Sequence, residues 1–126
     1  MTKYRFVQLC ASEEGFGIAG TVPTRDNNPM DLRHSPRSWH ALNAPEAIGQ
    51  IDSVEDGWAD ADRQAELWAE RGLNLAKVIY TLAPPNENNT ANYLEFVLAG
   101  LNKVSKFVPV TAGTSMQAVL LIPAEL

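Results

Sequence analysis

The chain has few of the residues that build disulfides and metal clusters. Its single cysteine, Cys10, excludes an internal disulfide and a cysteine-based metal cluster. Its two histidines, His34 and His40, are too few for a zinc site unless carboxylates complete the ligand set. We therefore expect no cofactor, and a metal site stays a minor alternative.

Long apolar runs and an excess of positive charge are also missing. The longest apolar runs, such as residues 118–122, are far too short to cross a bilayer, and no apolar segment of a secretory signal follows the N-terminus. The net charge of −5 argues against nucleic acid as the main ligand, because phosphate binding needs a positive surface. We expect a protein made without a signal peptide, with neither nucleic acid nor stable membrane insertion among its partners.

The composition is otherwise that of an ordinary globular protein, with 126 residues, 45% of them hydrophobic and 20% charged. Apolar residues recur at helical spacing along much of the chain. Helix caps precede several of these segments: Ser53, Asn74, and either Asn89 or Thr90. The expected helices cover residues 3–14, 54–71, 75–82 and 91–102, with a short last helix near 115–121.

Residues 17–50 show little periodicity and contain four of the eight prolines, which predicts a long structured loop. Such a loop in a small domain is usually functional. Residues 47–54 are expected to add a short hairpin or extended stretch. The sequence thus predicts a mainly α fold, a single domain over residues 1–126, with a small β element in its first half.

The most informative residue is Glu14, which lies seven positions after Val7 on the apolar stripe of the first helix. Its neighbour Glu13 points to the solvent side, and the glycines at 15 and 17 end the helix. A partly desolvated carboxyl group has a raised pKa and stays protonated near neutral pH, which is what a general acid requires. The alternative is a helix-end acid that forms a salt bridge with a nearby arginine.

Candidate binding residues follow in the loop. Arg25, Asn27 and Asn28 belong to an amide-rich run that offers hydrogen bonds to sugar hydroxyls and acetamides. The same run is rich in turn formers, so on the residues alone it favours a structural loop. Trp39 also lies in the loop and is the candidate for stacking on a sugar, whereas Trp58 and Trp68 lie on a helix stripe and are expected in the core.

Taken in order, five segments resemble phage and prophage proteins related to lysozyme-like cell-wall hydrolases. The first is Glu14-Gly15-Phe16, and the resemblance spans roughly residues 11–101. In this chain Asp26, Met30 and Asp31 stand where the pattern usually has asparagine, glycine and asparagine. Methionine at a glycine position predicts strain if that position needs a positive φ. The other segments are residues 22–32, 55–58, 71–75 and 83–93.

The resemblance implies a compact lysozyme-like helical fold in which Glu14 is the catalytic acid and Asn27 and Asn28 shape the cleft. The resulting hypothesis is a peptidoglycan glycosidase, a lysozyme or a lytic transglycosylase, acting on glycan strands at the cell wall or within a phage particle. No second carboxylate stands at a persuasive spacing, and Asp31 and Glu46 are the candidates for one.

Two alternatives remain open. The first is a non-catalytic phage virion structural or wall-binding protein, with other particle proteins as partners. The second is a metal-dependent peptidoglycan amidase or peptidase that uses His34, His40 and an acid.

Overall fold

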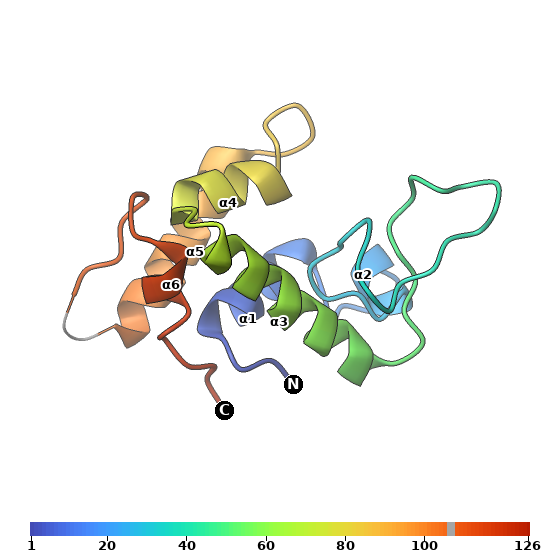
Figure 1. The fold of residues 1–126 in the computed structure, drawn as a ribbon, viewed down its shortest axis with the longest axis horizontal. Helices are drawn as coiled ribbons and strands as arrows, with labels where there is room; N and C mark the ends of the chain where they lie inside the picture. Colours follow the sequence, from blue (N-terminus) through green and yellow to red (C-terminus); the bar gives the residue numbers. More distant parts are fainter. Residues whose placement is uncertain (106–107) are drawn as a thin grey trace.

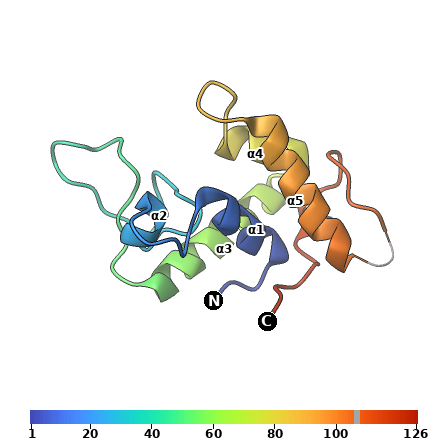
Figure 2. The same cartoon turned by 180° about the vertical axis from the view of Figure 1, so that it is seen from behind.

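The structure, a computed structural model, describes residues 1–105 and 108–126. The described residues form six helices, with α3 at the centre, α1 behind it and the last three helices to one side (Figures 1 and 2). The fold class is mainly α, as the sequence predicts. The helices are α1 (Arg5–Glu14), α2 (Val22–Arg25), α3 (Val54–Glu70), α4 (Leu75–Leu82), α5 (Thr90–Val104) and α6 (Met116–Val119).

Helix α1 has the apolar stripe that its sequence predicts, because Phe6, Val7 and Cys10 are completely buried. The helix begins two residues later than expected, since Tyr4 is extended and pairs with Pro123 in a single β-bridge. This bridge holds the two ends of the chain side by side (Figure 1). At the other end Gly15 adopts a left-handed conformation with φ of 86°, which only glycine takes at little cost.

The predicted caps of the longer helices are confirmed. The Ser53 hydroxyl accepts a hydrogen bond from the Asp56 amide, and Asn74 and Asn89 cap α4 and α5 in the same way. Each cap satisfies an amide that has no partner inside its helix. Of the two candidates for the α5 cap, the structure selects Asn89.

The long loop is more structured, and less β-like, than the sequence suggests. A one-turn helix, α2, begins at Val22 with Pro23 in its first turn, where the fixed φ of proline suits a helix. Four residues are too few for a helical period to show in the sequence. The predicted hairpin at residues 47–54 reduces, within the described residues, to one antiparallel bridge between Trp39 and Gln50.

Tertiary contacts fasten this loop to α3 on the side opposite α4 and α5 (Figure 2). Met30 is fully buried and joins the helical core. A Cβ atom added at Gly57 would lie 1.9 Å from the Asn27 carbonyl oxygen, so the loop backbone rests directly on the helix. Asp60, also buried, accepts hydrogen bonds from Ser35 and Arg37.

No helix in the described parts of the chain has both the length and the apolar character needed to cross a membrane.

Candidate functional site

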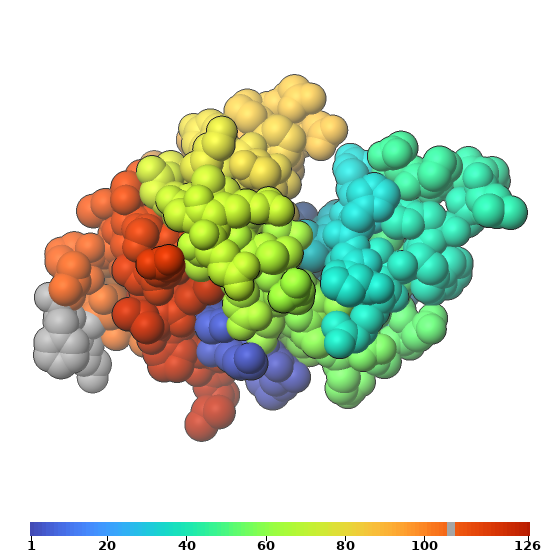
Figure 3. All heavy atoms as spheres, in the orientation of Figure 1, coloured from blue at the N-terminus to red at the C-terminus, as the bar shows by residue number. Residues whose placement is uncertain are grey.

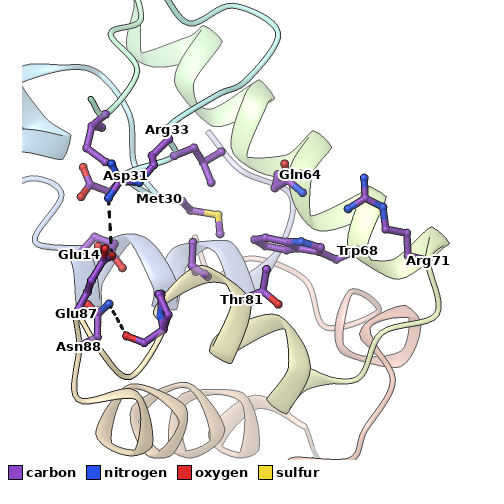
Figure 4. Close-up of a pocket in the computed structure, with 14 residues that line it drawn as sticks. Glu14, Met30, Asp31, Arg33, Gln64, Trp68, Arg71, Thr81, Glu87 and Asn88 are labelled. Carbon is purple, nitrogen blue, oxygen red and sulfur yellow. Dashed lines mark hydrogen bonds and ion pairs between the residues drawn. The ribbon is translucent and has the colours of Figure 1, made fainter. Parts of the chain in front are cut away.

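A cleft of about 620 Å³ lies between the long loop and the helices (Figures 3 and 4). Its walls come from the end of α1, the C-terminal half of α3, the end of α4, the segment after α2 and the turn between α4 and α5. This volume is within the range of small-molecule sites, about 300–1,000 Å³. The cleft is lined by Glu14, Met30, Asp31, Leu32, Arg33, Ile48, Gln64, Trp68, Arg71, Thr81, Leu82, Pro84, Glu87 and Asn88.

Glu14 lies at one end of this cleft, where the Gly15 turn stops α1 and leaves the carboxyl group in the wall. Burial raises its pKa to about 7. A hydrogen bond with Tyr93 lowers the pKa, while the nearby charges of Asp31 and Glu13 raise it further. Glu14 is thus protonated in a large fraction of molecules at neutral pH, and Glu13 is exposed.

Asp31 is one of three carboxyl groups that line the cleft, with Glu14 and Glu87. Burial and the charge of Asp26 raise its pKa, while Arg33 and Arg25 oppose the shift. Its backbone φ is 56°, in the left-handed region, whereas Met30 is not among the residues with positive φ. The left-handed conformation that the sequence suggests at Met30 is therefore found at Asp31, one residue later. Met30 packs in the hydrophobic core instead.

Asn27 and Asn28 do not line the cleft in the described structure. The Asn28 side chain is buried, donates to the Leu32 and Gly49 carbonyl oxygens at 2.7 and 2.9 Å, and accepts from the Leu32 amide. Asn27 donates to the Ile51 carbonyl oxygen at 3.0 Å. Both amides hold the loop together, so they position the cleft wall without lining it in the described structure.

Arg25 and Trp39 are also outside the cleft. Arg25 forms an ion pair with Asp26, with 3.0 Å between Nε and Oδ1. Trp39 is 48% exposed and donates from Nε1 to Asp52 Oδ1 at 3.0 Å. Of the predicted acid and binding residues, all of which lie in the described ranges, Glu14 lines this cleft, and so does Asp31, one of the two candidates for a second carboxylate; Glu46, the other candidate, does not.

The sequence missed the far end of the cleft, where Trp68, Arg71, Gln64 and Thr81 meet (Figure 4). Trp68 is only 5% exposed, as expected for the core, yet its edge forms part of the wall. The spacing of residues 64, 68 and 71 places them on one face of α3, which was a signal in the sequence.

An ion pair connects the two walls near Glu14. Arg33 Nη2 in the long loop lies 3.8 Å from Glu87 Oε2 in the turn between α4 and α5 (Figure 4). Both side chains are about half exposed, so the pair contributes little to stability, roughly 0–1 kcal/mol. Breaking this pair alone therefore costs little.

The metal alternative finds no support in the arrangement of the histidines. The rings of His34 and His40 are 4.9 Å apart, and His40 Nε2 lies 2.6 Å from the Arg33 carbonyl oxygen. Within residues 1–105 and 108–126, no three His, Cys, Asp or Glu side chains are grouped as metal ligands would be.

The raised pKa of Glu14 predicts a pH-dependent cost to folding. Between about pH 4.5, the ordinary value, and about pH 7, the folded chain holds a proton that the unfolded chain releases. The free energy of unfolding therefore falls as pH rises through this window. We expect Glu14→Gln to be more stable than wild type at about pH 8, with the difference shrinking toward about pH 4. Urea unfolding at both pH values measures it, and a pH-independent difference would contradict it.

Comparisons with protein-family models, with curated proteins and with solved structures give no match to this chain. The arguments for a function therefore come from the chemistry of the cleft.

Proposed function

We propose that the protein is a glycosidase that cleaves the β-1,4 bonds of peptidoglycan, with Glu14 as the general acid. One observation carries the proposal: a half-buried carboxyl group with a pKa of about 7 in the wall of a cleft large enough for sugars. Protonation of the glycosidic oxygen by Glu14 makes that oxygen a better leaving group.

The rest of the cleft suits a carbohydrate. Gln64, Thr81 and Asn88 offer hydrogen bonds to hydroxyl and acetamide groups, and Trp68 offers an apolar edge to a sugar ring. Arg71 offers a cation to the lactyl or peptide carboxylates of muramic acid residues. Peptidoglycan strands are therefore the proposed partner, and the proposed place of action is the cell wall or a phage particle.

The rival proposal is a non-catalytic virion or wall-binding protein of the same fold. The observation in its favour is the ion pair between Arg33 and Glu87, which connects the two walls of the cleft. A protein that only binds would tolerate an ion pair across the cleft. A glycosidase has to break this ion pair or to pass the glycan beneath it.

Purified protein incubated with peptidoglycan separates these proposals. A glycosidase releases muropeptides with new reducing ends or anhydro-sugars. A binding protein co-sediments with the wall and releases nothing. Release of free amines that EDTA abolishes would instead identify the metal-dependent amidase or peptidase.

The same assay predicts a pH profile. Glu14 has to be protonated to act as an acid, so kcat/KM is expected to decline above about pH 7. Between about pH 6 and pH 8 the protonated fraction falls roughly tenfold, and the rate should follow it. Initial rates of muropeptide release across this range measure the effect. A rate that stays constant up to about pH 9 would show that another group donates the proton.

A further inference from the structure

We propose that Asp31 is a second catalytic carboxylate, the base that removes a proton from the water attacking the sugar. The inference rests on the proposed function and adds to it the type of reaction, hydrolysis rather than anhydro-sugar formation. It also gives a role to a residue that stands where the resembling proteins usually have asparagine.

The first argument is position. Asp31 and Glu14 line the same cleft from different parts of the chain, one from the loop after α2 and one from the end of α1. Figure 4 shows both at the same end of the cleft, away from Trp68 and Arg71. Two carboxyl groups that flank one bond are what glycoside hydrolysis uses.

The second argument is that Asp31 is in an energetically unfavourable environment. Its Oδ1 atom is buried and has no hydrogen-bond partner in the described structure, which is unfavourable for a polar group. Its left-handed backbone adds a further cost for a residue other than glycine. Asp26 forms an ion pair with Arg25, and Asp60 forms one with Arg37. Asp31 differs from these two acids because its Oδ1 atom has no such partner in the described structure. Asp31 lines the cleft and its side chain is only partly buried, so the carboxylate is available to accept a proton from water in the cleft through its oxygen other than Oδ1.

The third argument is the division of charge between the two groups. Burial and the charge of Asp26 raise the pKa of Asp31, while the nearby cations Arg33 and Arg25 oppose that rise and so support its charged form. The charge of Asp31 in turn raises the pKa of Glu14. Interacting carboxyl groups in one site release their protons in separate steps, which leaves one acid and one base.

The resulting reaction balances. Glu14 gives its proton to the glycosidic oxygen, and the bond between that oxygen and C1 breaks with its electron pair leaving on oxygen. Water forms the new bond to C1 and passes a proton to Asp31. One water is consumed, a reducing end with inverted configuration forms, and solvent returns Asp31 to its charged form and Glu14 to its protonated form.

The test compares Asp31→Asn with Glu46→Gln on peptidoglycan. Glu46 is the matched control, because its side chain is 86% exposed and does not line the cleft in the described structure. We expect Asp31→Asn to form reducing ends roughly 100-fold more slowly than wild type. Glu46→Gln should match wild type. Asparagine and aspartate both adopt the left-handed region more readily than most residues, so Asp31→Asn should unfold close to the wild-type temperature.

The outcomes separate this inference from the proposed function. If wild type cleaves, Glu14→Gln does not, and Asp31→Asn cleaves like wild type, the inference about Asp31 fails while the glycosidase stands. Anhydro-sugars as the main wild-type product would overturn it in the same way. If wild type cleaves nothing, both fail. Added azide should restore cleavage in Asp31→Ala and give a glycosyl azide of inverted configuration, which a purely structural aspartate would not produce.

Discussion

Replacement of Glu14 by glutamine is expected to lower the rate of peptidoglycan cleavage by about 10³-fold or more. Glutamine keeps the size and the hydrogen-bonding capacity of the side chain but has no proton to give to the glycosidic oxygen. Because the carboxyl group is half buried at a helix end, the amide should occupy the same place without disturbing α1. The rate of muropeptide release at about pH 6, where wild-type Glu14 is largely protonated, measures the effect.

Glu13→Gln is the matched control. It makes the same change from carboxyl group to amide at the adjacent residue, which is exposed and is not among the residues that line the cleft. We expect its activity to stay close to that of wild type. Binding of Glu14→Gln to peptidoglycan should also persist, since the cleft keeps its other polar groups. A Glu14→Gln protein that cleaves as fast as wild type would refute the general-acid role.

The largest expected loss of stability follows replacement of Asp60 by alanine. The buried carboxylate accepts hydrogen bonds from the Ser35 hydroxyl at 2.6 Å, from the Arg37 amide at 2.8 Å and from the Arg37 guanidinium at 2.6 Å. Its removal leaves these donors without their partner and takes away one of the contacts that hold the loop to α3. We expect the free energy of unfolding to fall by about 3 kcal/mol, which is the size of effect seen when one partner of a buried ion pair is removed.

Urea unfolding followed by circular dichroism measures this loss. Glu55→Ala, at an exposed position on the same helix, is the control and should change the free energy of unfolding by less than about 0.5 kcal/mol. Limited proteolysis adds a local readout, because the segment around residues 35–38 should become sensitive to cleavage in Asp60→Ala. Equal stability of Asp60→Ala and Glu55→Ala would show that the loop is held by other contacts.

The helices were predictable because their determinants are local. Apolar spacing identified the buried stripe of α1, and the caps Ser53 and Asn74 marked where α3 and α4 begin. The same spacing separated Glu14 from Glu13 and placed the former toward the interior. These features depend on residues three or four positions apart, so the sequence contains them in full.

The roles of the loop residues were not predictable in this way. Asn28 bonds to Gly49, twenty-one residues away, and Asn27 bonds to Ile51, so both amides that the resemblance assigns to the cleft are used inside the loop. No residue pattern near Asn27 or Asn28 in the sequence indicates those partners. Trp68 shows the reverse case, since a residue expected only in the core also lines the cleft.

The sequence by itself determined the mainly α fold, the ends of the longer helices and the inward direction of Glu14. Only the tertiary structure decided which residues share the cleft with Glu14. It selected Asp31 over Glu46 as the candidate second carboxylate, and it replaced Asn27, Asn28, Arg25 and Trp39 with residues from α3, α4 and the turn before α5. The physical reason is that helices form from contacts within a few residues, whereas a cleft forms where distant segments pack together and leave a space between them.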